Sequence, residues 1–326
     1  MRNSLHSTAL VTGAAGFIGS HLVDLLLDGG QRVVGIDNLS RGTRNNLASA
    51  LKRPGFQFFQ ADLNDLPALR NIVQNANIEV VWHMAANSDI VGGMTDPAVD
   101  LQATFMTTFH VLGVMREFAI RKIAFASTSA VYGVHNKALT EDTGPLMPIS
   151  NYGAMKLAAE AVISAAVESF LERAWIFRFP NVVGSRATHG IIFDLLTKLS
   201  HNPPDLEVLG DGSQQKPYLH VSELLEAMLL ICDKADEPRN LFNIGPPDEG
   251  ATVKEIAMAV SRRAAPGLPV RFTGGSRGWV GDVPRFYYSI EKLAQLGWRP
   301  KLTSAEAIQK AVEEICLEFE ALLPRG

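Results

Sequence analysis

Residues 9–20 have the sequence Ala-Leu-Val-Thr-Gly-Ala-Ala-Gly-Phe-Ile-Gly-Ser, an apolar strand followed by a glycine-rich turn and the start of a helix. Gly13 permits the tight turn, Gly16 lets the backbone approach a diphosphate, and Gly19 lets the helix lie close to the strand. A diphosphate then sits at the helix N-terminus, where free N–H groups and the helix dipole favour anions. The pattern therefore predicts a dinucleotide-binding turn, with Phe17 and Ile18 among its contacts.

An acidic residue follows at the position that such a turn requires. Asp37 ends the next apolar run, 18 residues after Gly19. A carboxylate there hydrogen-bonds ribose hydroxyls and repels a 2′-phosphate, which predicts NAD rather than NADP as the cofactor. Arg41 and Arg44 lie close by in the sequence and could weaken this discrimination. Asp62, after the third apolar run, is expected to lie at the adenine edge.

Short apolar runs alternate with longer segments of helical spacing through the first half of the chain. The runs are Thr8–Thr12, Arg32–Ile36, Phe56–Gln60, Val80–Met84 and Lys122–Ser127, with Trp175–Phe179 as a later one. The alternation predicts an α/β fold, a Rossmann-type doubly wound parallel sheet. We expect an NAD-binding domain over residues 1–175, with returning segments near 176–184 and 218–245. A smaller, interleaved substrate-binding lobe is expected over 185–326, ending in a helix that Thr303 and Glu306 begin as a capping box.

The composition excludes several classes of protein. Of 326 residues, 47% are hydrophobic and 20% charged, and the net charge is −4, which indicates a globular protein without a basic nucleic-acid-binding surface. No stretch approaches the roughly 20 apolar residues of a membrane span. The two cysteines, Cys232 and Cys316, are too few for a disulfide framework or a zinc site, so no metal is expected. The polar start lacks a signal peptide, and a cytoplasmic location is predicted.

Tyr152 and Lys156 form a candidate catalytic pair. Their spacing places both side chains on one face of a predicted helix. A phenol with a pKa of about 10 becomes a base near neutral pH only if about 4 kcal/mol of preferential stabilisation favours the phenolate. A nearby ammonium and a positive nicotinamide ring both act in that direction. A hydroxyl-rich turn with Thr128 and Ser129 follows the fifth run, at the sheet edge where ligands bind.

These motifs together resemble the extended short-chain dehydrogenase/reductase family, specifically its NAD-dependent nucleotide-sugar epimerases and dehydratases. The similarity is greatest to its UDP-glucose (UDP-galactose) 4-epimerase group. The matching pieces lie in the family's order along nearly the whole chain. They are residues 12–19, Asp37-Asn38-Leu39, Asp62-Leu63, His83-Met84-Ala85-Ala86, Ser127–Gly133, Tyr152–Lys156, Arg178–Gly184, Gly210–Gln215, His220-Val221 and Gly281-Asp282-Val283.

The resemblance implies a role for each matching residue. Tyr152 is the catalytic base and acid, Lys156 holds the nicotinamide ribose and lowers the Tyr152 pKa, and Thr128 hydrogen-bonds the reacting sugar hydroxyl. The implied cofactor contacts are Gly13, Gly16, Phe17, Ile18, Asp37, Asn38, Asp62, Leu63, Ala85 and Ala86, together with Tyr152 and Lys156. The implied contacts to the nucleotide-sugar substrate, expected to be a UDP-hexose, are Asn87, Thr128, Asn181, Lys216, Arg277 and Asp282.

Two residues separate the possible reactions. Sugar 4,6-dehydratases carry Asp-Glu directly after the catalytic Thr, because elimination of water needs an acid/base pair, whereas this chain has Ser129 and Ala130. The resemblance therefore implies a 4-epimerase, with transient oxidation at C4 and hydride return to the other face. A dehydratase or another reductase of the same scaffold stays open, to be distinguished by its product. A non-catalytic nucleotide-binding protein also stays open, although it would not need the catalytic trio.

The chain departs from the family pattern at several positions. Lys216 replaces an arginine in the segment after Gly210, and Thr104 stands at a usual asparagine. Trp279 replaces a further arginine, so that Arg277 or Arg285 would take its place. The family usually pairs through helices of the sheet domain, which implies a homodimer through residues 103–119 and 152–170.

Overall fold

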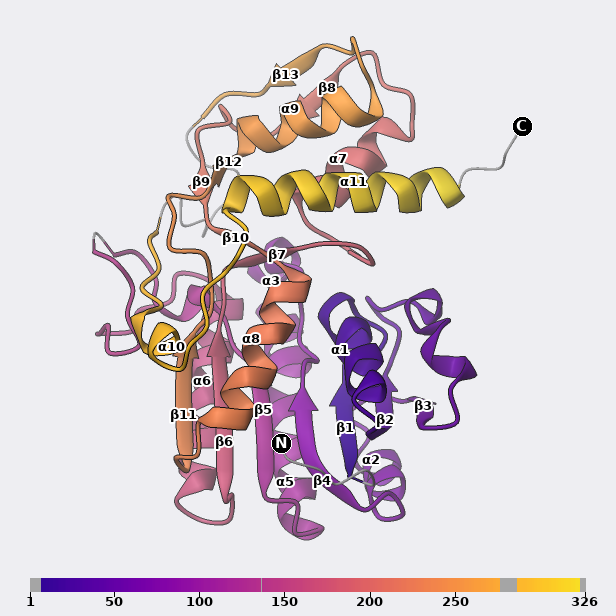
Figure 1. Cartoon of the computed structure of the whole chain (residues 1–326), viewed down its shortest axis with the longest axis vertical. Coiled ribbons are helices and arrows are strands. Elements are labelled where there is room, and N and C mark those ends of the chain that lie inside the picture. The colour runs from indigo at the N-terminus through magenta and orange to yellow at the C-terminus, as the bar shows by residue number, and fades with distance from the viewer. Residues whose placement is uncertain (1–6, 136, 276–285, 323–326) are drawn as a thin grey trace.

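The computed structural model describes residues 7–135, 137–275 and 286–322, and its centre is a seven-stranded parallel sheet (Figure 1). The strand order is β11-β6-β5-β4-β1-β2-β3. The strands are β1 (Thr8–Thr12), β2 (Arg32–Asp37), β3 (Phe56–Gln60), β4 (Ile78–His83), β5 (Lys122–Ala126), β6 (Arg173–Arg178) and β11 (Arg239–Asn243). This confirms the predicted Rossmann-type α/β fold.

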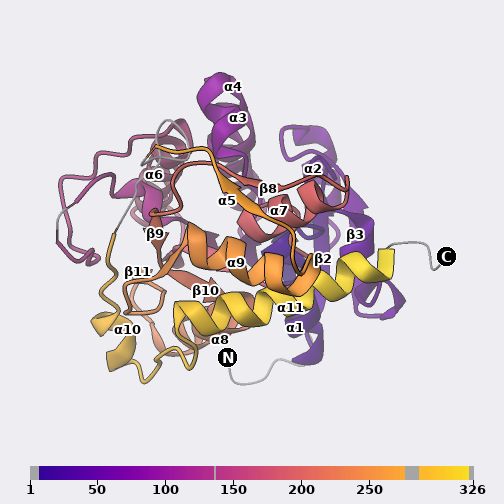
Figure 2. The same ribbon diagram turned by 90° about the horizontal axis from the view of Figure 1, so that it is seen from above.

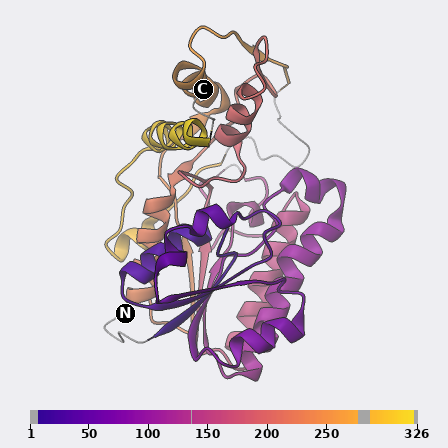
Figure 3. The same ribbon diagram turned by 90° about the vertical axis from the view of Figure 1, so that its right-hand side faces the viewer.

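Helices cover both faces of the sheet, as Figure 3 shows. Apolar side chains of α1 (Phe17–Asp28) and α8 (Val221–Lys234) form the core on one face. Those of α2 (Leu66–Val73), α5 (Thr107–Glu117) and α6 (Asn151–Val167) form the core on the other face. Every residue of β1 is buried. Burial on both faces explains why this strand has a continuous apolar sequence rather than an alternating one.

A second group of helices lies beyond the carboxyl edge of the sheet, as Figure 1 shows, and faces the viewer in Figure 2. It has an apolar core of its own. It contains α7 (Ile191–Leu199), α9 (Val253–Ala264) and α11 (Ser304–Leu322), with β8 (Leu206–Val208) paired to β13 (Val270–Phe272). At the start of α11, Thr303 Oγ1 accepts from Glu306 N at 3.3 Å and Thr303 N donates to Glu306 Oε2 at 2.8 Å. The predicted capping box is therefore confirmed.

Shorter elements complete the described part of the fold. The strands are β7 (Asn181–Val183), β9 (Gln215–Lys216), β10 (Tyr218–His220) and β12 (Ala251–Thr252), with β7 paired to β10 and β9 to β12. The helices are α3 (Ile90–Thr95), α4 (Pro97–Asp100) and α10 (Glu291–Gln295). Helical turns lie at η1 (Arg44–Leu47), η2 (Ala50–Lys52) and η4 (Ser129–Val131), and a π-helical segment, η3 (Leu101–Met106), leads into α5. Among the described residues, no helix combines the length and apolar character that a membrane span requires.

Candidate active site

The glycine turn has the geometry that a bound diphosphate needs. Gly13 has φ +67°, and a Cβ there would lie 2.9 Å from the Ala85 backbone nitrogen. A Cβ at Gly19 would collide with the carbonyl oxygen of Gly13, so α1 lies against the turn only because this residue is glycine. No side chain caps α1, and its first turn has no acidic residue. The N–H groups around Phe17 and Ile18 can therefore receive the diphosphate of NAD.

Asp37, the last residue of β2, lies against this turn, and Asp62, two residues after β3, is joined to the next residue, Asn38. Asp37 accepts hydrogen bonds from Ala15 N at 2.9 Å and from Leu39 N at 2.8 Å, and burial raises the pKa of its carboxyl group. Asn38 Nδ2 donates to Asp62 Oδ2 at 2.9 Å. A carboxylate oxygen accepts more than one hydrogen bond, so Asp37 keeps capacity for a ribose hydroxyl. The neighbouring Leu63 is a core residue that is 6% exposed.

A buried histidine connects the ends of β1 and β4 to α5. Thr108 Oγ1 donates to Thr104 O at 2.9 Å, and so it accepts from His83 Nε2, also at 2.9 Å. His83 Nδ1 is then an acceptor, which receives the hydroxyl hydrogen of Thr12 at 2.7 Å. Thr12 Oγ1 in turn accepts from Ala85 N at 3.3 Å. The neutral Nε2–H tautomer satisfies all four hydrogen bonds and fixes the segment that begins at Ala85.

This arrangement predicts an acid-sensitive contribution to stability. Burial lowers the pKa of His83 to about 3. Because the unfolded chain binds a proton near pH 6.5, the His83 contribution is complete above that pH and is lost as the pH falls toward 3. Between the two pKa values the loss is about 1.4 kcal/mol per pH unit. We expect urea unfolding at pH 7 and pH 5 to show a smaller pH dependence in His83→Gln than in the wild type; an equal dependence would contradict the assignment.

Thr104 and Asn87 fix the loop that follows β4. Thr104, at the position where the family pattern has asparagine, accepts a hydrogen bond from Asn87 N at 3.1 Å. Asn87 Nδ2 donates to Oδ1 of the buried Asp100 at 2.8 Å. The threonine therefore binds the backbone of this loop, and Ala85, Ala86 and Asn87 are held above the carboxyl end of β4.

The predicted catalytic residues meet at the carboxyl ends of β5 and β6. Thr128 begins the turn η4 and accepts a hydrogen bond from Ala130 N at 3.1 Å, and its hydroxyl lies close enough to Tyr152 to favour the charged form of that phenol. Lys156 is 2% exposed, and its Nζ donates to Ala126 O at 2.6 Å. The same Nζ lies 5.9 Å from the centre of the Tyr152 ring.

Burial shifts the pKa values of Tyr152 and Lys156 in opposite directions. It raises the pKa of Tyr152 to about 12, although the nearby Thr128 hydroxyl acts to lower this pKa. It lowers the pKa of Lys156 to about 7, although the negative charge of Glu160 acts to raise this pKa. The protein alone therefore favours a neutral phenol, and Lys156 by itself does not give the lowered Tyr152 pKa expected from the sequence. The positive ring of oxidised NAD, bound next to Tyr152, would supply the missing stabilisation of a phenolate.

Gly153 determines how close Tyr152 comes to Thr128. A Cβ on Gly153 would lie 2.6 Å from the carbonyl oxygen of Ala130. We expect Gly153→Ala to push the start of α6 away from η4 and to lower kcat by roughly tenfold, because small misplacements at a reacting centre are costly. Steady-state kinetics test this, with Gly113→Ala as the control, since a Cβ at Gly113 meets no atom within 4 Å. Equal kcat values in the two variants would contradict the prediction.

A buried ionic network lies beneath the catalytic residues. Arg178 donates to Glu160 through Nε at 3.0 Å and through Nη2 at 2.6 Å. Ser127 Oγ also donates to Glu160, and the Arg178 guanidinium lies 4.8 Å from the centre of the Tyr132 ring. The sequence prediction missed Glu160, although its place one helical turn after Lys156 was a usable signal.

The predicted substrate residues are only partly placed. Asn181 begins β7 and is exposed, and it pairs with Tyr218 of β10, two residues after Lys216. Arg277 and Asp282 lie outside the described residues. The structure thus brings Thr128, Tyr152 and Lys156 together at the same edge of the sheet as the glycine turn, while the substrate contacts stay predictions. Among the described residues, no group of three or more His, Cys, Asp or Glu side chains could hold a metal ion.

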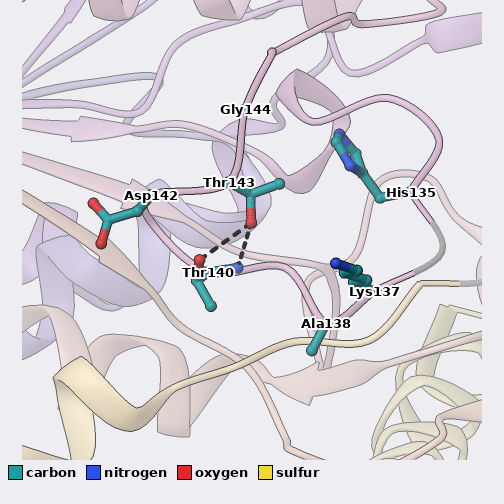
Figure 4. A pocket seen from close by; sticks show the side chains of 7 residues that line it. All are labelled: His135, Lys137, Ala138, Thr140, Asp142, Thr143 and Gly144. Carbon is teal, nitrogen blue, oxygen red and sulfur yellow. Dashed lines mark hydrogen bonds between the residues drawn. The ribbon is translucent and has the colours of Figure 1, made fainter.

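A hollow of about 480 Å³ lies on the loop between η4 and α6 (Figure 4). Its lining residues are His135, Lys137, Ala138, Thr140, Asp142, Thr143 and Gly144. Thr140 N donates to Thr143 Oγ1 at 2.8 Å, so the loop closes on itself. No predicted cofactor or substrate residue lines this hollow, and the chemistry is assigned to the edge of the sheet instead.

Comparison with known proteins agrees with this geometry. The model of the NAD dependent epimerase/dehydratase family matches residues 9–245. The UDP-glucose 4-epimerase of Mycolicibacterium smegmatis is 31% identical over 310 residues, which is 93% of this chain and 97% of that protein.

Solved structures agree as well. A crystal structure of a UDP-galactose 4-epimerase superimposes with a TM-score of 0.84 and 36% identity, over 97% of this chain and 100% of the other. The UDP-glucose 4-epimerase of Thermus thermophilus, in complex with NAD, has a TM-score of 0.84 and 30% identity over the same shares. The glycine turn, Asp37 at the end of β2 and the Tyr152–Lys156 pair all lie within the residues that the family model matches. The chain belongs to the NAD-dependent epimerase/dehydratase family, with NAD as its cofactor.

Proposed function

We propose that this protein is a nucleotide-sugar 4-epimerase that interconverts UDP-glucose and UDP-galactose. The observation that carries the proposal is the contact of Thr128 with Tyr152, beside Lys156 and next to a turn without a second acid/base group. Relatives that cover nearly the whole chain and bear the names UDP-glucose and UDP-galactose 4-epimerase support the same reaction.

The side chains supply proton transfer and orientation at the sugar C4. NAD held at the glycine turn would supply the acceptor, and afterwards the donor, of the C4 hydrogen. Tyr152 takes the proton of the O4 hydroxyl as C4 becomes a ketone, and it returns that proton when C4 is reduced. Thr128 hydrogen-bonds the same oxygen, and Lys156 lies where it can hold the nicotinamide ribose. The sugar then turns its other face before reduction, so no atom is lost or gained overall.

The turn η4 argues against elimination of water. Ser129 and Ala130 stand at the two positions where dehydratases carry an acid/base pair. A methyl group transfers no proton, and a serine hydroxyl is far too weak an acid or base at neutral pH to act without a partner. Oxidation and re-reduction at C4 need no such pair.

The product of purified protein tests the proposal. We would incubate it with UDP-glucose, UDP-galactose, their N-acetyl derivatives and UDP-glucuronate, and analyse the mixtures by chromatography with mass detection. A new peak of unchanged mass from UDP-glucose, formed without added NAD, is the expected result. A product lighter by one water would assign a dehydratase, and turnover of another sugar alone would correct the substrate.

An apolar face on the sheet domain supports a homodimer. Leu101 and Phe109 are 40% and 54% exposed, and Phe105 lies between them and stacks on Phe109 at 6.3 Å between ring centres. Their spacing of four residues lines them up on one side of η3 and α5, next to α6. Such a stripe, with small residues such as Ala161 and Ala165 exposed on α6, suits pairing of two helices with two helices.

Charge placed on this face should separate the subunits. We expect Phe109→Glu to shift the mass measured by light scattering from dimer to monomer, because a carboxylate would be buried without a partner. The control is Leu317→Glu on α11, where the side chain is 52% exposed. A wild-type mass equal to one chain would contradict the dimer.

The cytoplasm is the proposed location. Cys232 and Cys316 are both buried free thiols. Unpaired thiols of this kind are typical of proteins that work in a reducing compartment.

A further inference from the structure

An ion pair joins the two loops that flank the glycine turn. Nη2 of Arg41, in the loop after β2, lies 2.5 Å from Oδ2 of Asp89, in the loop after β4. Strands β2 and β4 are the two neighbours of β1, and all three run parallel. Because their carboxyl ends meet at one edge, a bond between these loops passes across the end of β1, where the turn Gly13–Gly16 lies.

Both partners are held by the backbone around them. Next to Arg41, Thr43 N donates to Ala15 O at 3.0 Å, and a Cβ at Gly42 would lie 2.7 Å from the Ala15 carbonyl carbon. The loop after β2 is therefore pressed onto the glycine turn itself.

Asp89 is fixed on the other side. Its Oδ1 accepts from Gly92 N at 2.9 Å, and its own N–H donates to Asn87 Oδ1 at 2.9 Å. The Gly92 N–H group and the Arg41 guanidinium hold the pKa of Asp89 below its ordinary value, so the pair stays charged.

The pair also adjoins the segment that leads into α7. The pKa of His189 is lowered by burial and by the charge of Arg41, and Asp89 acts against this. Charges act this strongly only over short distances in water. His189, which precedes α7, is therefore close enough to Arg41 and Asp89 for both charges to act on it.

We propose that the Arg41–Asp89 pair closes over the diphosphate of bound NAD and slows its release. The inference rests on the proposed placement of NAD at the glycine turn. A cofactor lying on the N–H groups of Phe17 and Ile18 is covered by this bridge and leaves only after the bridge opens. Slow release of NAD fits a redox-neutral reaction, because the same NAD molecule is reduced and reoxidised within one turnover and need not be exchanged for another from solution.

The release rate of NAD tests the proposal independently of turnover. We would load the full-length protein with radiolabelled NAD⁺, add excess unlabelled NAD⁺, and follow the label that stays bound. The variants are Arg41→Met, Asp89→Asn and the double variant. Asn keeps the hydrogen bond to Gly92 N. Since an exposed ion pair contributes up to about 1 kcal/mol, each single change should speed release roughly two- to fivefold.

Three further results distinguish the bridge from other roles. The double variant should release NAD no faster than either single variant, because both remove the same interaction. High salt should narrow the difference between wild type and variants, because it screens exposed charges. Arg53→Met, which breaks a 2.6 Å ion pair with Asp28 at the opposite edge of the sheet, should leave release unchanged.

Two outcomes would overturn the proposal. Fast release from Arg41→Met with wild-type release from Asp89→Asn would show that Arg41 holds the cofactor alone. Unchanged release in all three variants would show that the pair does not cover the cofactor. A wild-type protein that does not retain labelled NAD would instead refute the placement of NAD at the glycine turn. A wild-type protein that retains NAD but has no epimerase activity would refute the proposed function.

Discussion

Replacing Tyr152 with Phe is expected to lower kcat by about 10²- to 10⁴-fold, because a positioned general acid/base contributes a rate enhancement in that range. The substitution keeps the ring and removes only the hydroxyl that contacts Thr128. The glycine turn and Asp37 are untouched, so the NAD content of the purified variant should equal that of the wild type. Conversion of UDP-glucose to UDP-galactose, measured with NAD content on the same preparation, provides the test.

Tyr132→Phe is the matched control, because it removes a buried tyrosine hydroxyl outside the catalytic group. The Tyr132 hydroxyl donates to Asn243 Oδ1 at 2.8 Å, away from the Tyr152–Lys156 pair. Its loss should cost about 1–3 kcal/mol of stability and leave kcat within a few-fold of wild type. Wild-type turnover by Tyr152→Phe would remove Tyr152 from the mechanism, and equal losses in both variants would indicate general damage.

Much of the fold could be predicted because its signals are local. Apolar runs bounded by glycine and polar residues gave five strands of the sheet to within two residues, since strands buried on both faces need continuous apolar sequence. The run Trp175–Phe179 predicts a sixth strand, which the structure places at Arg173–Arg178. The strand order and the edge strand β11 depend on contacts across the sheet, which a run of residues does not reveal.

The candidate site divides in the same way. The spacing of Tyr152 and Lys156 makes them a candidate pair on one helix, and the resemblance to the family adds their roles and selects Thr128 in the turn after the fifth run. The partners of His83 and Asp89 were not predicted, because Thr108 and Arg41 come from other elements. The pKa of about 7 for Lys156 was also missed, because burial is a property of the packed structure.

Glu160 and Arg178 lead to the second large expected effect, in stability rather than in turnover. Their side chains are 8% and 4% exposed, so both charges have left water. Breaking such a pair leaves one buried charge uncompensated, which costs about 3–5 kcal/mol. We expect Arg178→Met to lower the free energy of unfolding in urea by this amount, a large part of the roughly 5–15 kcal/mol typical of a folded protein.

The double variant Arg178→Met with Glu160→Met separates the cost of a stranded charge from the net value of the pair. Removing both charges leaves no ion in the core, so most of the stability lost in Arg178→Met should return. Arg70→Met is the exposed control, since Arg70 and Glu117 are 47% and 43% exposed and their 2.7 Å pair should contribute within about 1 kcal/mol. If Arg178→Met lowers the free energy of unfolding no more than Arg70→Met does, the result would mean that water reaches Glu160. The network beneath Lys156 would then be too wet to produce the lowered lysine pKa, because that shift arises from the same exclusion of water.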